Sequence, residues 1–193
     1  MQINGSATIA DAHLRTYVWA SRPMLSNDAI YAIEYFFDYC LENGLSAKIL
    51  GDTFHTLTPL PEFIKPLFDK LDLMQEAGLP VYYIQGNHDL NKVPWLSLHQ
   101  WPINLDQQII ELPETGMTIL GRQSCSRDEL LEMFDTLPEN VDTLMMHQAE
   151  AKALPFSPQF ELKEVPDQIK TVLIGDIHNP QDYIAGETHL WYP

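Results

Sequence analysis

Apolar and polar positions along the first half of the chain follow a strand–helix–strand pattern. Short apolar runs predict strands, and longer segments with apolar residues at helical spacing predict helices between them. The predicted elements are strands at 5–10, 48–50 and 81–84 and helices at 26–43, which Ser26 would cap, and at 61–77. Alternation of this kind predicts parallel strands joined by right-handed crossovers, in an α/β fold.

The second half is less regular but contains the same kinds of element. Its predicted elements are a hairpin of 109–112 with 117–120, a helix from Ser126 to about 137, strands at 141–146 and 171–174, and a hairpin of 183–185 with 189–192. Three prolines in 149–166 predict a long surface loop. The chain has no internal repeats, and we interpret residues 1–193 as one domain.

Polar clusters follow several of the predicted strands. They are Asp11-Ala-His13, Gly51-Asp52, Gly86-Asn87-His88-Asp89, a lone His147, and Gly175-Asp176-Ile177-His178. The functional groups of parallel sheets collect beyond the carboxyl ends of the strands, so these clusters are expected to meet on one rim.

The clusters contain the donors that a pair of divalent cations needs. Two cations roughly 3.5–4 Å apart repel each other, so they need a bridging anion and further anionic or imidazole ligands. Asp52 is the candidate bridge. The expected ligands are Asp11, His13, Asp52 and His178 for one ion and Asp52, Asn87, His147 and Asp176 for the other. Mixed oxygen and imidazole donors without a thiolate suit Mn²⁺, Fe²⁺ or Zn²⁺.

His88 is left over from this ligand set and is the candidate general acid. It would reach the leaving-group oxygen, and Asp89 would orient and charge it. A hydroxide bridging both metals would then attack phosphorus in line. The other histidines, His55, His99 and His189, are treated as ordinary residues.

Each motif alone is weak, because surface turns are rich in Asp, Asn and Gly, and a lone histidine is more often structural than a ligand. The case depends on five clusters in one order, each at the predicted end of a strand. This coincidence favours a dinuclear metal hydrolase.

In this order the motifs resemble those of the calcineurin-like metallophosphoesterase superfamily, from Asp11 to His178. Finer features are similar to the SbcD-type subunit of the double-strand-break repair nuclease. They are Leu50-Gly51-Asp52-Thr53-Phe54-His55 and Ile174-Gly175-Asp176-Ile177-His178-Asn179-Pro180-Gln181. The resemblance implies a two-layered β-sandwich flanked by helices, two metal ions, with Mn²⁺ first and Mg²⁺ among the alternatives, and exo- and endonuclease activity on DNA.

Two departures from the family pattern stand out. The last motif usually has His where this chain has Asp176, whose charge would bind a cation tightly while making it a weaker Lewis acid. The family also continues into a DNA-capping domain and a segment that binds an SbcC-type coiled-coil ATPase, whereas this sequence ends at Trp191-Tyr192-Pro193. We interpret the chain as either truncated or a minimal phosphoesterase module. A homodimer through the predicted helices is a further expectation from the family.

The charged residues of the chain bear on which substrate it can bind. Eleven Lys and Arg against 27 Asp and Glu give a net charge of −16, which repels phosphate backbones. DNA binding would therefore need help from a partner or from a missing segment. The sequence has no signal peptide, two distant cysteines and no apolar stretch near the roughly 20 residues that span a membrane, so we expect a cytoplasmic protein, in the host cytoplasm if it is viral.

Two other functions stay open. One is a phosphoesterase acting on small molecules or nucleotides, which the acidic composition favours. The other is a weakly active, metal-binding regulatory subunit, which Asp176 and the negative charge favour.

Overall fold

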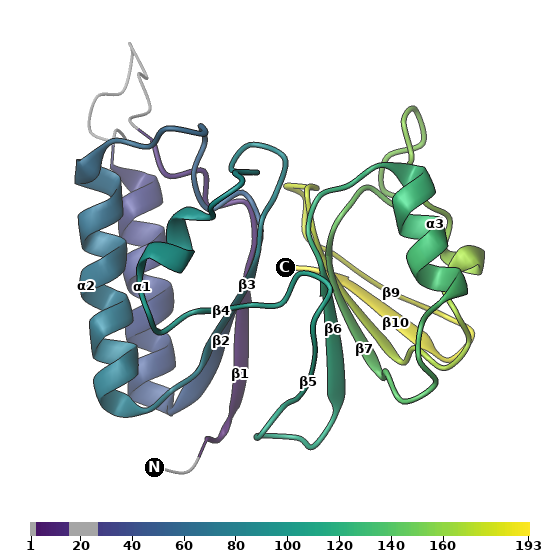
Figure 1. Ribbon diagram of the computed structural model, residues 1–193, viewed down its shortest axis with the longest axis horizontal. Coiled ribbons are helices and arrows are strands. Elements are labelled where there is room, and N and C mark those ends of the chain that lie inside the picture. Colours follow the sequence, from purple (N-terminus) through teal and green to yellow (C-terminus); the bar gives the residue numbers. More distant parts are fainter. Residues whose placement is uncertain (1–2, 16–26) are drawn as a thin grey trace.

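Two β-sheets face each other, and helices cover the outer face of each (Figure 1). The computed structural model describes residues 3–15 and 27–193. The expected α/β fold, a two-layered sandwich flanked by helices, is confirmed. Among the described residues, no helix is both long and apolar enough to cross a membrane.

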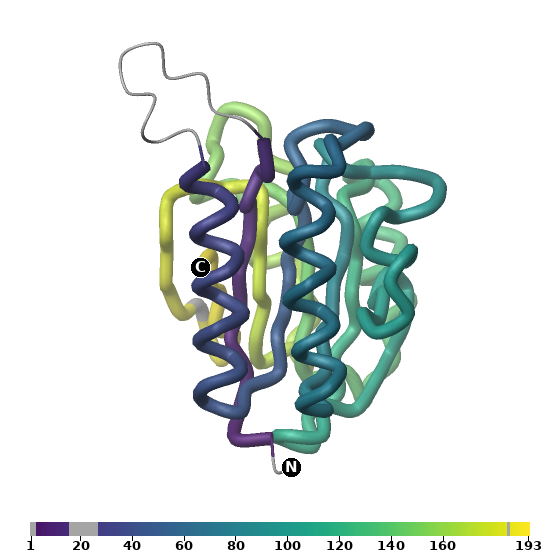
Figure 2. The backbone as a smooth tube through the Cα atoms, turned by 90° about the vertical axis from the view of Figure 1, so that its left-hand side faces the viewer, coloured from purple at the N-terminus to yellow at the C-terminus, as the bar shows by residue number. Residues whose placement is uncertain are grey.

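The first sheet is built entirely from parallel strands in chain order. Its strands are β1 (Gly5–Ile9), β2 (Leu45–Leu50), β3 (Val81–Ile84) and β4 (Ile103–Asn104), with α1 (Asp28–Asn43) and α2 (Pro61–Ala77) as crossovers. Figure 2 shows α1 and α2 lying side by side over this sheet. Their apolar faces pack on the sheet, in a core that includes Ile33, Phe37, Leu67 and Leu71.

The second sheet has the order β5-β6-β7-β8-β10-β9, with parallel pairing at its centre and an antiparallel pair at each edge. Its strands are β5 (Ile109–Glu111), β6 (Thr118–Arg122), β7 (Thr143–His147), β8 (Thr171–Gly175), β9 (Gln181–Ala185) and β10 (Thr188–Tyr192). Helix α3 (Arg127–Asp135) covers its outer face, and two short 3₁₀ turns, η2 (Trp95–Leu98) and η3 (Leu162–Glu164), lie in the loops.

Alternating side chains divide the second sheet between two cores. Leu144 and Met146 of β7 belong to the outer core with α3, while Met145 between them faces the first sheet. This is the two-residue period of a strand that is buried on both faces. The inter-sheet core therefore joins the two halves of the molecule directly.

Local signals set most element ends. Pro61 occupies the first turn of α2, where its missing N–H costs nothing, and Gly44 and Gly78 end α1 and α2 in left-handed conformations. The capping box at Ser126 is present, with Glu129 as its partner. The expected cap of the first helix, Ser26, lies outside the described residues.

The segment 149–166 is a loop, as predicted, with residues 155–158 exposed and η3 as its one regular turn, but both of its ends are anchored in the core. Glu150 is 3% exposed and Phe160 is fully buried. The Glu150 carboxylate accepts hydrogen bonds from the Tyr183 hydroxyl at 2.5 Å and from the backbone N–H of Lys152 and Leu162. Because these donors satisfy the buried carboxylate, the segment can pack against the second sheet in spite of its prolines.

Candidate metal centre

The polar clusters meet at one edge of the sandwich, where the carboxyl ends of β1, β2 and β3 face those of β7 and β8 (Figure 1). The ligand atoms of three residue sets lie within 4.8 Å of one another in each set. These sets are Asp11, His13 and His178; Asp11, Asp52 and His147; and His13, His55 and His88. Both sheets therefore contribute to one site, as the sequence predicts.

His147 lies at the centre of the site and is almost fully buried. Its Nδ1 is 2.6 Å from the carbonyl oxygen of Leu50, and a carbonyl can only accept, so Nδ1 carries the proton. The other ring nitrogen, Nε2, then faces Asp52 at 3.6 Å, Asp176 at 3.8 Å and Asp11 at 4.0 Å. Asn87 Oδ1 is 3.2 Å from the same nitrogen.

His13 and His178 form the other half of the site. Their Nε2 atoms are 3.1 Å apart, and His13 Nε2 is 3.5 Å from the Asp52 carboxylate. His178 Nε2 is 3.7 Å from Asp11 Oδ1. Asp52 thus contacts both halves, which fits the bridging position that the sequence predicts for it.

Exposure increases from the inner to the outer residues of the site. The side chains of Asp52 and His147 are at most 2% exposed, whereas those of Asp176 and His178 are 28% and 64% exposed. The inner residues are held rigidly by the two sheets. The outer residues leave the site open to a substrate from solvent.

Unusual backbone conformations are concentrated in this site. Five non-glycine residues among those described have positive φ, and four of them are predicted ligands: Asp11 at 53°, His13 at 44°, Asp52 at 48° and Asp176 at 89°. Such conformations cost energy and cluster at functional sites. Backbone hydrogen bonds hold them, since the N–H of His13 donates to the Asp52 carbonyl at 2.8 Å and the N–H of Asp176 donates to the Asp11 carboxylate.

Three glycines of the motifs give the side chains room. A Cβ on Gly86 would overlap the Asp52 carboxylate, and one on Gly51 would overlap the His147 ring. A Cβ on Gly175 would overlap the Leu50 carbonyl and lie 2.7 Å from His147 Nδ1. Glycine is therefore required at each position by close approach to a candidate ligand.

The electrostatics of the site favour a positive charge. Burial lowers the pKa of His147, but its hydrogen bond and ion pairs with Asp52 and Asp11 outweigh burial and raise that pKa to about 9. Burial and the neighbouring histidines lower the pKa of His13 to about 4, against the pull of Asp52. The same carboxylates that hold a proton on His147 would attract a metal cation.

The arrangement fits two divalent cations. The carboxylates of Asp11, Asp52 and Asp176 all lie within 4.0 Å of His147 Nε2, and they would repel one another without a positive centre among them. The hydrogen bond from His147 Nδ1 to the Leu50 carbonyl is the contact by which proteins fix the tautomer of a metal-binding histidine. All seven predicted ligands lie in this arrangement.

The structure corrects the expected role of Asp89. Its carboxylate accepts hydrogen bonds from the backbone N–H of Gly86, Thr53 and Phe54 at 2.8–3.2 Å, so it ties together the loops after β2 and β3. The ring of His88 is oriented instead by its Nδ1, 3.1 Å from the carbonyl oxygen of His55. Burial raises the pKa of Asp89 to about 6.

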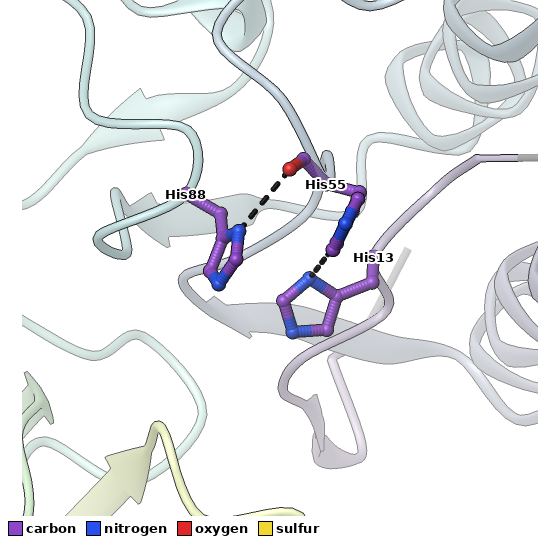
Figure 3. A group of neighbouring side chains, drawn as sticks. All are labelled: His13, His55 and His88. Carbon is purple, nitrogen blue, oxygen red and sulfur yellow. Dashed lines mark hydrogen bonds between the residues drawn. The ribbon is translucent and has the colours of Figure 1, made fainter.

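Sequence reasoning missed His55. Figure 3 shows it beside His13 and His88, with its ring stacked on that of His88 at 4.9 Å and its Nδ1 3.2 Å from His13 Nδ1. Arg15 contacts the Nε2 of His55. The available signal was its position three residues after Asp52, in the loop that carries the bridging ligand.

A family model described as calcineurin-like phosphoesterase matches residues 7–180. The chain belongs to the calcineurin-like phosphoesterase family. Membership, together with the clustered ligands, supports a metal-dependent hydrolase of phosphoester bonds.

Two curated relatives of this phosphoesterase have related sequences. DNA double-strand break repair protein Mre11 of Methanosarcina acetivorans is 24% identical over 196 residues, covering 94% of this chain and 32% of that protein. The Archaeoglobus fulgidus protein of the same name is 24% identical over 217 residues, covering 97% and 48%. The chain spans between about a third and a half of the length of these relatives.

Solved structures support the phosphoesterase fold. TT1561 of Thermus thermophilus has a TM-score of 0.58 at 11% identity, covering 96% of this chain and 87% of that one. Phosphopantetheinyl hydrolase (PptH) of Mycobacterium tuberculosis has a TM-score of 0.60 at 10% identity, covering 99% and 89%. At these identities the likeness concerns the fold alone.

Proposed function

We propose that the protein is a dinuclear-metal-dependent phosphodiesterase that cleaves DNA, as an exo- and endonuclease of the double-strand-break repair type. The observation that carries the proposal is the meeting of Asp11, Asp52 and His147 from separate strand ends of both sheets, with ligand atoms within 4.8 Å of one another. Mn²⁺ is the proposed metal, because the donors mix carboxylate and amide oxygens with imidazole nitrogens.

The proposed ligand division follows the two halves of the site. Asp11, His13 and His178 would hold one ion, and Asn87, His147 and Asp176 the other, with Asp52 shared. When bound, the two ions would supply charge for the phosphoryl oxygens and acidify a water molecule. The chain's own part is to hold these ligands at fixed spacing by the rigid strand ends.

His88 is the proposed proton donor to the leaving oxygen. Because its Nδ1 donates to the His55 carbonyl, its other nitrogen, Nε2, is the one that can hold and deliver a proton. The stacked ring of His55 restricts rotation of the His88 ring. His88 lies 4.8 Å from His13, ring centre to ring centre, so the proton would be delivered at the edge of the metal site.

DNA is the proposed substrate because both curated relatives are double-strand-break repair proteins that align with nearly the whole chain. The net charge of −16 means that a partner must supply much of the grip on DNA. An SbcC-type coiled-coil ATPase is the proposed partner, and a second copy of this chain is the alternative.

The test is degradation of linear DNA in the presence of Mn²⁺. The wild-type protein is expected to cleave it, and His88→Ala to lower the rate about 10²- to 10⁴-fold, the usual contribution of a general acid, while still binding metal. His189→Ala, on the exposed part of β10, is the matched control and should keep activity. Metal-loaded protein that leaves single- and double-stranded DNA intact would refute the DNA assignment.

The strongest alternative is hydrolysis of a small phosphoester or nucleotide. Its motivation is the acidic surface, which disfavours a polyanion more than a small substrate with few charges. A panel of nucleotides, cyclic nucleotides and phosphomonoesters separates the two functions. Turnover of these compounds without cleavage of DNA would decide for the alternative.

A further inference from the structure

The proposed metal centre depends on how the two sheets sit against each other. Asp11 and Asp52 follow strands of the first sheet, whereas His147 ends β7 and Asp176 follows β8 in the second. A small sliding of one sheet over the other would change every distance between these two groups. The structure must therefore fix the relative position of the sheets.

The core between the sheets cannot do this alone. It is made of apolar side chains: Leu50, Tyr82, Ile84, Leu105, Leu112, Ile119, Met145 and Leu173. Apolar burial stabilises contact between the layers but is not directional, so it resists separation more than it resists small displacements. A directional contact is needed to set the register.

Polar contacts cross this interface at both ends. At the metal edge, His147 Nδ1 donates to the Leu50 carbonyl at 2.6 Å and the N–H of Ser124 donates to the Gln85 carbonyl at 3.0 Å. The contact at the opposite end involves Ser46, Lys48 and Glu114.

Lys48 of β2 donates from Nζ to Glu114 Oε1 at 3.0 Å, and the Ser46 hydroxyl donates to the same oxygen at 2.7 Å. Glu114 lies in the turn between β5 and β6, so the contact joins the first sheet to the second. The side chains of Lys48 and Glu114 are 2% and 0% exposed, and Lys48 Nζ lies 5.9 Å from the centre of the Tyr82 ring.

The buried ion pair of Lys48 and Glu114 is expected to contribute little to the free energy of unfolding. Glu114 Oε2 is buried and has no hydrogen-bond partner among the described residues. Burial lowers the pKa of Lys48, against the attraction of Glu114, so desolvating the charge is unfavourable. Buried ion pairs often contribute less to stability than apolar residues of the same size, and their best-attested use is to specify geometry.

We propose that Ser46, Lys48 and Glu114 form a clasp that fixes the register of the two sheets and thereby positions His147 and Asp176 against Asp11 and Asp52. The proposal rests on the proposed function, because it concerns the same metal centre. These are positioning residues, since they contact neither the metal ligands nor a substrate.

Strand β2 connects the clasp to the metal site. Lys48 lies on β2, and Asp52 follows two residues after the end of that strand, so at about 3.3 Å per residue the two are at most roughly 13 Å apart. The two sheets are thus held at the metal edge by the ligands and at the other end by the clasp. A rigid strand transmits a displacement at one end to the other.

The experiment replaces the whole ion pair, in Lys48→Met with Glu114→Leu. The double variant removes both buried charges, so its stability is expected to equal or exceed that of the wild type in chemical denaturation without metal. Its affinity for the second Mn²⁺ ion, measured by calorimetric titration, is expected to fall roughly tenfold, the lower end of what losing an orienting partner costs. A merely structural role would move stability and leave metal affinity unchanged.

Two further variants keep the test decisive. Ser46→Ala removes one hydroxyl and should lower the second-ion affinity by a smaller factor of about two to five, even if the double variant does not fold. Leu71→Ala, in the core between the helices and the first sheet, is the control: it should reduce stability without changing metal affinity.

The outcomes separate the clasp from the proposed function. Wild-type affinity for both ions in the double variant, or in Ser46→Ala if only that variant folds, overturns the clasp and leaves the metal centre intact. Failure of the wild-type protein to bind two ions overturns the metal centre, and the clasp with it.

Discussion

At the scale of single residues, strain and close packing at the metal centre support each other. Four predicted ligands hold left-handed backbone, which costs on the order of 1–3 kcal/mol each for non-glycine residues. Asp and His tolerate this conformation better than most side chains. The hydrogen bond from the N–H of Asp11 to the Gly51 carbonyl at 3.2 Å, across β1 and β2, belongs to the network that holds the strain.

Gly175→Ala tests the close approach at His147. The added Cβ meets the Leu50 carbonyl and the His147 ring, so the variant should lose about 1–3 kcal/mol of unfolding free energy and bind metal roughly 10–100-fold more weakly. Gly121→Ala is the matched control, because its Cβ would lie 2.5 Å from Leu105 Cβ, away from the site. Equal loss of metal affinity in both variants would contradict the prediction. Denaturation and calorimetry provide the two readouts.

The affinity for metal should rise with pH. Below the pKa of His147, about 9, its Nε2 carries a proton that a cation must displace, so affinity increases up to about tenfold per pH unit from neutral pH and levels off above that value. His13, with a pKa of about 4, is already neutral at pH 7 and releases no proton. Calorimetry in buffers of different ionisation enthalpy counts the protons released. Affinity independent of pH over this range would contradict the assignment of His147 as a ligand.

At the scale of elements, the buried carboxylate of Glu150 anchors the segment 149–166 to the second sheet. Tyr183 of β9 donates its hydroxyl to Glu150, and Lys152 Nζ lies 4.1 Å from the centre of the Tyr183 ring. The link joins the segment after β7 to the C-terminal hairpin. It therefore holds together two parts of the second sheet that lie far apart in the sequence.

Tyr183→Phe should lower the free energy of unfolding by about 1.5–3 kcal/mol, the usual worth of a hydrogen bond to a charged group. Tyr35→Phe, on the 73%-exposed position of α1, is the control and should change it by less than about 0.5 kcal/mol. Urea denaturation measures both. A Tyr183→Phe variant as stable as the control would mean that the backbone donors alone satisfy Glu150.

The same elements explain what the sequence could reveal. Helix 61–77 is predicted with its observed bounds because Pro61 and Gly78 are strong local signals. The strand at 48–50 is predicted three residues too short, because Ser46 is polar and its burial against Glu114 depends on a distant turn. The burial of Glu150 at the start of the loop 149–166 was not predictable for the same reason, since its partner Tyr183 lies elsewhere in the chain.

In the candidate site, too, some features could be predicted from the sequence, whereas others depend on contacts between distant residues. The meeting of the candidate ligands was predictable because each stands at or just after a strand end, and strand ends of parallel sheets converge by topology alone. The partners of Asp89 were not, because they are backbone amides of its own loop and of the loop after β2. His55 was missed because only its position three residues after Asp52 pointed to the site, and its stacking on His88 depends on a second loop that lies elsewhere in the sequence.

At the scale of the whole molecule, charge determines how this protein could hold DNA. With 11 basic and 27 acidic side chains, it has few groups to replace the counterions of a phosphate backbone. Among the described residues, the groups of side chains that could hold a metal ion all lie in the candidate metal centre. Contact with DNA by the isolated chain is therefore expected to be local and to require the metal.

Salt dependence measures this directly. The affinity falls with salt by a slope of about −0.9 for each phosphate neutralised by Lys or Arg, so six to ten contacts would cost about 10³- to 10⁵-fold between 50 and 200 mM salt. For this chain we expect one or two such contacts, and hence a loss of only about three- to twelve-fold over that range. Fluorescence anisotropy with a labelled duplex, with and without Mn²⁺, provides the measurement. A steep slope that persists without metal would mean that a basic surface grips DNA independently of the site, and the partner invoked to supply that grip would then be unnecessary.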